Sequence, residues 1–570
     1  MKSKKIIALG LVAAMTIAMV TGCGGKKSES SNKTVTSQSE ADEMVIGMNS
    51  DIIACDPAFA YDNNTNAVVD QITEGLLAYD QDNKLVSKLA KSWEQVDDVT
   101  YKYEIRDDVK FSDGTQMTAD DVVFSLNRIK DPSVASYLNW MYANVDSIEK
   151  TGDWEVTVKL STPDALWQYV PATTAGHVIS QKFYEENKDD FGKPGTGIIG
   201  TGPYKFDSWT KDSEIVLSEN ENYWDKDNNA ENAAKTLDYK IITEGTTLVS
   251  ALQSGQVDLT MGLPTDQIPV IKKNDSLTIT ESDSFGTDYI AFNTQKAPFD
   301  DVNVRKAIYY ALDRNQILDN ITNGTVSEAS ASLINEALCT FNENDWKEYL
   351  KNVPDYEYNM EKAKEYLAKS SVPDGFECSI VCNQTATQNA EALLLQTALK
   401  ELNITLNINK VTEDERVSTF MGGDGRNYDM IFCLWFSDFP DPAGNLNSVY
   451  PSTAGEEGGA NAAVYNNSDV DTWLTEELAS SDSTERTELM QKILDKVTDD
   501  VPYLVLDHPK VIMVTNSKVV EPKFSAEYQF NLFFKDFNLN YICLFNYLFI
   551  SSQMSAKPYF IGSTGILLLW

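Results

Sequence analysis

Residues 376–411 contain the pattern that most restricts the fold of this chain. An alternating stretch, FECSIVCN, is followed by a helical stretch, AEALLLQTALKELN, and then by a second strand-like stretch, ITLNINKV. The first stretch has the two-residue period of a strand, and the middle one is long enough for a helix. A strand, a helix and a strand in direct succession are typical of a sheet with parallel neighbours. The sequence therefore predicts a mixed α/β protein with a parallel component.

Further elements follow from the same periods along the 570 residues. At roughly 150 residues per domain, this length suggests about three or four structural units. Strands are predicted from residue 44, at Tyr101–Ile105, and within 154–163, 284–301 and 428–436. Helices are predicted within 70–80, after the N-cap Thr118, and within 246–255, 302–318 and 360–370.

The charge of the chain argues against one class of partner. Its 86 acidic and 47 basic residues give a formal net charge of −39. Such a field repels phosphate backbones, so nucleic acid is not expected as a partner. We interpret the acidity as a solvated surface, and the alternative is weak steering of cationic ligands.

The first residues resemble a bacterial lipoprotein signal. Basic residues at positions 2, 4 and 5 precede the apolar stretch 6–20, which is too short to span a membrane, and VTGC follows, ending at Cys23. The resemblance to a lipobox implies a signal peptide at 1–22, lipidation of Cys23 and anchoring to the outer face of the cell membrane. The alternative is a plain secretory signal with an incidental cysteine. Residues 23–43 are small and polar, which predicts a flexible tether.

Neither the cysteines nor the histidines indicate a catalytic or metal site. The cysteines form no CxxC motif, and Cys378 and Cys382 would lie about 13 Å apart along a strand, too far for a bridge. We expect both to be small apolar side chains on one face. His177 and His508 are far apart in sequence, which disfavours a zinc site or a histidine-dependent triad. Phosphate-loop, HExxH and GxSxG motifs are absent as well, so no enzyme, cofactor or metal is predicted.

The stretch KPGTGIIGTGPYKF, residues 193–206, has the Gly-x-Gly-x-x-Gly spelling of a dinucleotide-binding loop at Gly195, Gly197 and Gly200. That loop needs a strand before it and a helix after it. The preceding residues are polar, and Pro203 with the alternating Tyr204 and Phe206 indicates a turn that leads into a strand. The glycines are therefore predicted to serve backbone geometry at a crossover rather than a cofactor.

GTGPYKF at 200–206 resembles a signature of the oligopeptide-binding class of extracytoplasmic solute-binding proteins of ABC importers, bacterial solute-binding protein family 5. The resemblance covers about residues 44–537. Other matching stretches are TEGLLAYD, LAKSWEQVDD, YKYEIRDDVKFSDGTQMTADDVVFSLNR, NENYWDK, ALQSGQVDL, FNTQKAPFDDVNVRKAIYYALDR, SDFPDP and VYNNSDVD. It implies an α/β, two-lobed periplasmic-binding-protein-like fold of type II, with an extra subdomain and the ligand in the cleft between the lobes.

The resemblance also implies domain boundaries. Lobe I is expected to be discontinuous, an extra subdomain to pack on it, and lobe II to be continuous. The expected ranges are 44–62, 200–285 and 505–537 for lobe I, 63–199 for the subdomain, and 286–504 for lobe II.

Residues 538–570 form an anomalous apolar tail, since 541–570 contain no acid and one base. We interpret the tail as a frameshifted or read-through end; the alternative is a membrane-associating segment.

The ligand site is expected at WFSDFPDP, residues 435–442, which follows a predicted strand. In similar peptide binders the carboxylate at the position of Asp438 takes the α-ammonium of the ligand, and Trp435 matches an aromatic residue of the pocket wall. The alternatives are an Asx turn for Asp438 and core packing for Trp435. Extended segments 59–64, 261–263 and 285–289 match those that bind peptide main chains. The candidate wall residues in them are Tyr61, Met261, Phe285 and Tyr289.

One position departs from the family pattern. Some peptide binders carry an arginine six residues before the carboxylate, where this chain has Phe432. The prediction is therefore a monomeric lipoprotein that delivers oligopeptides to an ABC permease, without a fixed clamp for a peptide carboxylate. The alternatives are another solute on the same fold, such as a nickel chelate, haem or an oligosaccharide, and a peptide-sensing receptor without transport. An extracellular hydrolase is disfavoured by the lack of a catalytic constellation.

Overall fold

A seven-stranded sheet is built from both ends of the described chain. The computed structural model describes residues 42–328, 330–422, 425–527, 530 and 532–540. The order of strands is β12 (Leu277–Ser282), β19 (Val511–Asn516), β11 (Leu259–Thr260), β1 (Glu43–Met48), β10 (Thr236–Ile241), β9 (Glu214–Glu219) and β8 (Tyr204–Thr210). β1 is parallel to β10 and β11, and the other pairs are antiparallel.

Helices cover both faces of this sheet because its side chains alternate. Met44 and Ile46 of β1 pack with Val68 and Ile72 of α1 (Asn63–Ile72). On the opposite face, Leu248 belongs to a cluster contributed by α4 (Gly245–Ser254) and α5 (Ile268–Ile271). Both faces are thus buried, as expected for a central strand with parallel neighbours.

A six-stranded sheet holds the strand–helix–strand unit predicted from the sequence. Its order is β14 (Val326–Glu328), β18 (Tyr503–Pro509), β13 (Gly286–Phe292), β17 (Met430–Phe436), β15 (Glu377–Cys382) and β16 (Thr405–Lys410). Helix α10 (Ala386–Lys400) joins β15 to its parallel neighbour β16. β15 is also parallel to β17, whereas β13 is antiparallel to both β17 and β18. The predicted parallel component is confirmed.

The alternation of side chains divides the core of this sheet into two clusters. Ile290 and Phe432 pack on one face with helices α6 (Val302–Ala311), α9 (Met360–Lys369) and α10. Tyr289 and Cys433 pack on the other face with helices α12 (Pro442–Val449), α13 (Ser468–Ala479) and α14 (Ser483–Asp500). The remaining helices around this sheet are α7 (Asn315–Asn320), α8 (Glu343–Leu350) and α11 (Glu413–Phe420).

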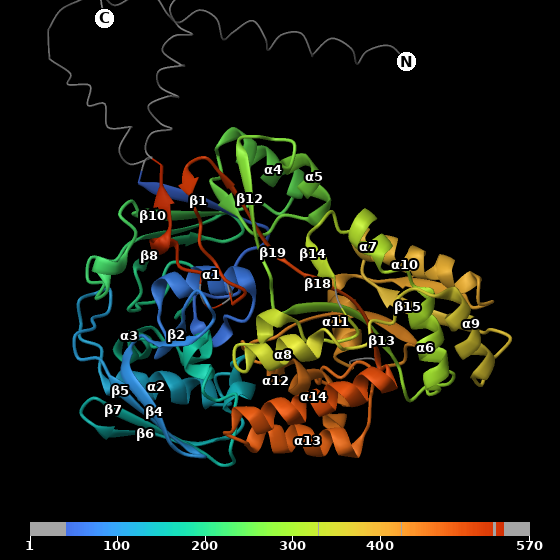
Figure 1. The fold of residues 1–570 in the computed structure, drawn as a ribbon. Helices are drawn as coiled ribbons and strands as arrows, with labels where there is room; N and C mark the ends of the chain where they lie inside the picture. The colour runs from blue at the N-terminus through green and yellow to red at the C-terminus, as the bar shows by residue number, and fades with distance from the viewer. Residues whose placement is uncertain (1–41, 329, 423–424, 528–529, 531, 541–570) are drawn as a thin grey trace, which may run out of the picture. The chain divides into compact units, whose positions relative to one another are not determined.

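A smaller four-stranded antiparallel sheet has the order β4 (Ala90–Asp97), β5 (Thr100–Ile105), β7 (Glu155–Leu160) and β6 (Val145–Gly152). Helix α2 (Ala119–Lys130) packs on it and begins at the predicted N-cap, where Thr118 and Asp121 form a capping box. In Figure 1 this sheet and the α13–α14 pair lie next to each other at the bottom of the view, and the Ala165 amide donates to the Leu478 carbonyl there (2.9 Å). Shorter elements are β2 (Leu77–Tyr79), β3 (Leu85–Ser87), α3 (Gln181–Asn187), β20 (Val519–Val520) and β21 (Asn538–Leu539).

The chain passes between the two large sheets in two places. One lies between β12 and β13, at residues 283–285, and the other at Lys510, between β18 and β19. The Ser284 hydroxyl donates to the Pro509 carbonyl and joins the two passages. Because β18 stays paired with β13 and β14 as far as Pro509, the expected lobe boundary at 505 falls too early, and the crossing is at residue 510.

Two other predictions meet the structure with different outcomes. The helix predicted within 70–80 is wrong beyond Ile72, where α1 ends and β2 soon follows. Gly75 instead forms an isolated antiparallel bridge with His177, and a Cβ at Gly75 would stand 2.4 Å from the Pro171 carbonyl oxygen, so glycine is required there. The strand predicted after Pro203 is confirmed, since residues 201–203 bend directly into β8 and no helix follows Gly200.

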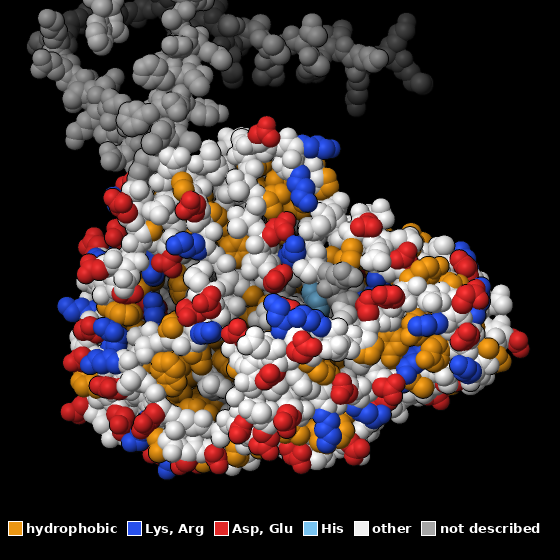
Figure 2. Space-filling view, viewed as in Figure 1, with side chains coloured by type: hydrophobic (Ala, Val, Ile, Leu, Met, Phe, Trp, Pro, Cys, Tyr) orange, Lys and Arg blue, Asp and Glu red, His pale blue; other side chains and the backbone are white. Residues whose placement is uncertain are grey.

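The structure agrees with the predictions of an acidic, solvated surface (Figure 2) and of apolar, unbridged cysteines in β15. Figure 2 shows carboxylates scattered over the visible face with Lys and Arg side chains between them, as a solvated acidic surface requires. Cys378 and Cys382 are free, buried and part of one cluster, which confirms the prediction for β15. Cys23 and the tail 541–570 lie outside the described residues. Within those residues, no helix combines the length and the apolarity that a membrane span needs.

Candidate functional site

A cavity of about 540 Å³ lies between the seven-stranded and the six-stranded sheet. Met48 of β1, Met261 after β11 and Ile512 of β19 line it from the first sheet. Leu434 and Phe436 of β17 line it from the second. The volume lies within the range of small-molecule sites. The cavity is therefore the first candidate for a ligand site.

The wall formed by the second sheet carries three carboxyl groups. Asp288 of β13 and Asp507 of β18 are partners in the strand register, and Glu391 comes from α10. Burial raises the pKa of Glu391 to about 8, with a further contribution from Asp288. Burial also raises the pKa of Asp507 and of Asp288, although the charge of Arg416 opposes the shift at Asp288. We call these three residues the acidic wall.

Asp438 stands in the loop that follows β17. Its side chain is partly buried, and loss of water raises its pKa to about 7. Across the described part of the chain, the Asp438 carboxylate has no hydrogen bond and no ion pair. Burial is the main cause of the raised pKa of Glu527 and of Tyr79, and the negative charge of Asp438 raises both further. A carboxyl group in this state becomes a strong acceptor when a cation reaches it.

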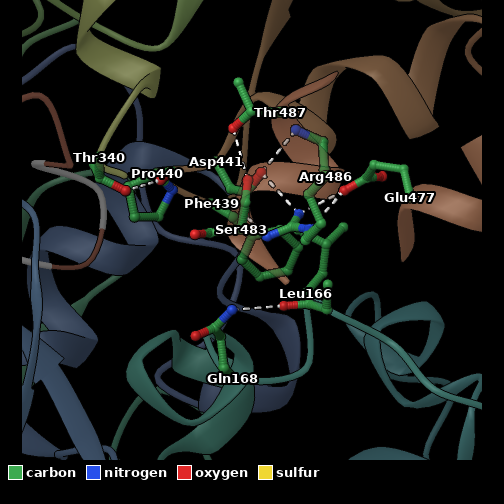
Figure 3. Close-up of polar contacts among 12 residues, drawn as sticks. Leu166, Gln168, Thr340, Phe439, Pro440, Asp441, Glu477, Ser483, Arg486 and Thr487 are labelled. Carbon is green, nitrogen blue, oxygen red and sulfur yellow. Dashed lines mark hydrogen bonds and ion pairs between the residues drawn. The ribbon is translucent and has the colours of Figure 1, made fainter. Parts of the chain in front are cut away.

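The loop that carries Asp438 is fixed at its end by a buried ion cluster. Asp441 caps α12 by accepting from the Ala443 amide (2.9 Å), and Pro442 occupies the first helical position. Figure 3 shows the Arg486 guanidinium between Asp441 and Glu477, with ion-pair distances of 3.0 and 2.6 Å. The whole cluster is buried. It holds the loop in one position relative to α13 and α14.

Exposed aromatic rings lie beside the same loop. Tyr61, Tyr137 and Trp140 are 56%, 52% and 52% exposed, although residues of this kind are usually covered. Tyr61 and Phe59 both contact Tyr137, at centroid distances of 5.1 and 5.5 Å. Trp140 contacts Phe439, the neighbour of Asp438, at 6.2 Å. We call these five residues the aromatic patch, and through Phe439 it includes the residue that follows Asp438 in the loop.

The predicted site residues fall in different places. Met261 lines the cavity, as do Asp62, Asn63 and Asn64 of the predicted segment 59–64. Tyr61 belongs to the aromatic patch, and Asp438 precedes Phe439 of that patch in the sequence.

The other three predicted residues pack in or against the core of the six-stranded sheet. Phe285 and Tyr289 are buried there, and Tyr289 contacts the Tyr503 ring at 4.8 Å. Trp435 is partly buried against the same cluster and faces Phe420. None of the three lines the cavity. The strand period carries odd-numbered residues of β17 toward α12 and leaves Leu434 and Phe436 to face the cleft.

Sequence reasoning missed the acidic wall and most of the aromatic patch. A signal existed for the acids, since Asp288 and Asp507 each interrupt an otherwise apolar strand, TDYIAF and YLVLDHP. A charged residue inside a buried strand needs a partner or a ligand. Tyr137 and Trp140 had no such signal, because the adjacent Met141 and Tyr142 are just as apolar and are buried.

The described residues show no cluster of three or more His, Cys, Asp or Glu side chains that could hold a metal ion. Both histidines are buried, which lowers the pKa of His177 to about 3 and that of His508 to about 4. Each imidazole is therefore neutral at physiological pH. They accept or donate locally, to Thr73 (2.8 Å) and Thr287 (3.0 Å) respectively.

Two helix-covered sheets joined by two crossings, with a cavity between them, form the architecture of a two-lobed binding protein. Residues 84–457 match the family described as "Bacterial extracellular solute-binding proteins, family 5 Middle". The chain belongs to this family. It is thus a solute-binding protein of an ABC importer, and not an enzyme.

Relatives and solved structures cover nearly the whole folded part of the chain. The glutathione-binding protein GsiB of Pectobacterium atrosepticum is 24% identical over 484 residues, which is 84% of this chain and 91% of that protein. DppA from Helicobacter pylori in complex with the peptide STSA has a TM-score of 0.72 at 23% identity, covering 87% of this chain and 98% of DppA. NikZ from Campylobacter jejuni in complex with Ni(L-His) has a TM-score of 0.70 at 22% identity, covering 85% and 96%. These structures share the fold with this chain.

Proposed function

We propose that this protein captures oligopeptides outside the cytoplasm and delivers them to the permease of its ABC importer. The observation that carries the proposal is the unpaired carboxylate of Asp438, two residues after the cavity-lining Phe436 and one before Phe439 of the aromatic patch. Asp438 would take the α-ammonium of the peptide, as the resemblance to peptide binders implies. The glutathione-binding relatives support a ligand of this class.

The physical basis is the difference between the empty and the occupied carboxylate. Burial without a partner raises the pKa of Asp438 to about 7, so the empty site has no compensation for its charge. An α-ammonium supplies that compensation through a charge-assisted hydrogen bond of about 1.5–3 kcal/mol. The aromatic patch offers apolar contact to side chains with little discrimination by sequence. Such a site suits many peptides with a free amino terminus.

The first experiment identifies the natural ligand. Native mass spectrometry of the purified protein, followed by denaturation, releases whatever the cavity retains. Recovery of peptides is the expected result. Recovery of a nickel chelate, haem or a sugar in their place would contradict the proposal and favour another solute on the same fold.

The second experiment tests the anchor. Calorimetric titration with a tetrapeptide should show that Asp438→Asn weakens binding roughly 10- to 150-fold, which corresponds to the loss of about 1.5–3 kcal/mol. N-acetylation of the peptide should weaken binding to the unmodified protein and abolish any further effect of Asp438→Asn. Asp146→Asn, a change at an exposed carboxylate in β6, is the matched control and should leave affinity unchanged. An equal effect of Asp438→Asn on both peptides would remove Asp438 as the anchor.

Attachment to the membrane is part of the proposal and rests on the sequence around Cys23, which lies outside the described residues. We infer a lipid on Cys23 and a monomeric binding protein. Mass spectrometry of the amino-terminal peptide from the membrane fraction should show a diacylglyceryl group on that cysteine, and Cys23→Ala should release the protein into the medium. Peptide uptake that depends on the neighbouring permease would separate import from sensing.

A further inference from the structure

The cavity between the sheets is lined by carboxyl groups that the proposed anchor at Asp438 does not use. Asp288, Glu391 and Asp507 form the acidic wall on one side, and Asp62 at the start of α1 lines the opposite side. Lys510 alone is basic among the described residues that line the cavity, and it pairs with Glu281 at 3.2 Å. The cavity therefore has an excess of acid on two facing walls.

Two of these carboxyl groups have buried oxygens without partners. Asp507 is 1% exposed, and neither of its oxygens has a hydrogen-bond partner in the portion of the chain that is described. Asp62 Oδ1 caps α1 by accepting from the backbone amides of Asn64 (3.1 Å) and Thr65 (3.0 Å). Asp62 Oδ2 is buried and has no hydrogen-bond partner among the described residues. Buried polar atoms in native proteins are almost always satisfied. Two such groups on facing walls of one cavity indicate a ligand that supplies hydrogen-bond donors.

The neighbouring arginines are directed elsewhere. Arg416 pairs with Glu413 (2.6 Å) and donates to the Phe432 carbonyl (2.9 Å). Arg314 pairs with Asp355 and donates to the Val505 carbonyl (3.3 Å). Their charges oppose the rise of pKa at Asp288 and Asp507 respectively, but burial outweighs them.

The donor must also be a cation of suitable shape. Among the described residues no cluster of His, Cys, Asp or Glu suited to a metal ion is found, and we consider organic cations as the donor. Ammonium and guanidinium groups carry several donors and can satisfy carboxylates from two sides. The net charge of −39 attracts such cations over a longer range.

We propose that the acidic wall and Asp62 bind the cationic side chain of a peptide, so that the preferred ligands are oligopeptides that contain lysine or arginine. This inference rests on the proposed function, since the same peptide is anchored by its α-ammonium at Asp438. The two sites are continuous along the chain. Phe436 lines the cavity two residues before Asp438, and Asp62 lines it next to Tyr61 of the aromatic patch.

The test compares peptides that differ only in one charge. A series of tetrapeptides of alanine carries lysine at each position in turn, and a matched series carries norleucine, which has a similar length without the ammonium. Calorimetric titration of the unmodified protein should show at least a tenfold preference for lysine at one position. Equal affinity for lysine and norleucine at every position would overturn the proposal.

Variants then assign the preference to the cavity. Asp507→Asn keeps the shape of the side chain and removes a buried unpaired charge, so we expect it to fold. It should weaken binding of the lysine peptide and reduce the preference for lysine to less than twofold, and Glu391→Gln should act in the same direction. Asp146→Asn should change neither affinity. A preference for lysine that survives both cavity variants would refute the assignment.

The outcome also separates this inference from the proposed function. Asp438→Asn should weaken the lysine and norleucine peptides by the same factor, because both carry the α-ammonium. If Asp438→Asn has no effect while Asp507→Asn abolishes the preference, the cavity binds cations and the anchor is wrong. If only Asp438→Asn acts, the anchor stands and the inference about the cavity fails.

Discussion

Replacement of Arg486 by methionine tests the ion cluster that holds the binding loop. In the native protein the Arg486 side chain is 5% exposed, and the carboxylates of Asp441 and Glu477 are 0% exposed. Its Nε and Nη2 atoms donate to Glu477 Oε1 (2.9 and 2.6 Å), and Nη1 and Nη2 donate to Asp441 (3.0 and 3.2 Å). Arg486→Met keeps an unbranched apolar stem but lacks the guanidinium, so it removes all four contacts and leaves two carboxylates buried without a cation.

The size of the effect follows from burial. Breaking a buried ion pair by removing one partner destabilises a protein by about 3–5 kcal/mol, and we expect that loss at pH 8. Burial already raises the pKa of Glu477 against the opposing charge of Arg486, so the variant raises it further. A carboxyl whose folded pKa lies above its unfolded pKa destabilises more as pH rises. The loss should therefore shrink by up to about 1.4 kcal/mol for each pH unit below 8 as Glu477 takes up a proton.

Urea unfolding followed by tryptophan fluorescence at pH 8 and pH 6 measures both effects. Lys496→Met on the same helix is the control, because Lys496 pairs with Asp500 in a partly exposed i,i+4 position (2.7 Å) that contributes about 0.5 kcal/mol or less. The reasoning would be refuted if Arg486→Met at pH 8 cost no more than the control. A loss that did not depend on pH would contradict the role given to Glu477.

Two further predictions concern the crossover glycine and the buried carboxyls. Gly200→Ala should lower the free energy of unfolding by at least roughly 1–3 kcal/mol, because the added Cβ would stand 2.0 Å from the Ile72 carbonyl oxygen. The control is Gly195→Ala, where the native φ is +90° but no atom lies near the added Cβ. Thermal unfolding should show a larger loss of stability for Gly200→Ala than for this control. The ligand-free protein should lose stability as pH rises from 5 to 8. Burial raises the pKa of Asp438 to about 7 and that of Glu391 to about 8. The folded state therefore holds protons that the unfolded state releases near pH 4. Urea midpoints that rose over this range would contradict the second prediction, and Asp438→Asn should reduce the slope.

The elements of the fold were largely predictable because they depend on local periods. The β15–α10–β16 unit and the Thr118 cap are each specified within about 35 residues of sequence by alternation, helical length and a capping residue. The helix prediction for residues 70–80 was wrong beyond Ile72 because the apolar residues there fit the strand period as well as the helix period. The structure pairs Gly75 with His177 and packs it against the backbone at Pro171, and no local pattern contains these tertiary contacts.

Sequence motifs led to part of the candidate site. Resemblance to a family signature led to the loop of Asp438, whose role as an anchor stays a prediction, and the segment around Met261 led to a residue that lines the cavity. The acidic wall depends on the register that places Asp288 opposite Asp507, two strands from distant parts of the chain. Phe285 and Tyr289 were assigned to the cleft although they pack in the core, since a strand period shows which residues share a face but not which face meets the other lobe.

The position of β18 and β19 within the sheets has a consequence for biogenesis. β18 is an interior strand of the six-stranded sheet and β19 an interior strand of the seven-stranded sheet, yet they are consecutive along the chain at residues 503–516. Until this late segment has been synthesised, β13 lacks its neighbour β18. In the other sheet, β19 is missing between β11 and β12. Both lobes are therefore completed by the same few residues, and such long-range pairing makes folding slow. Residues 286–504 taken alone would leave β14 unpaired and an open edge along β13, so the lobe they form depends on the return of the chain.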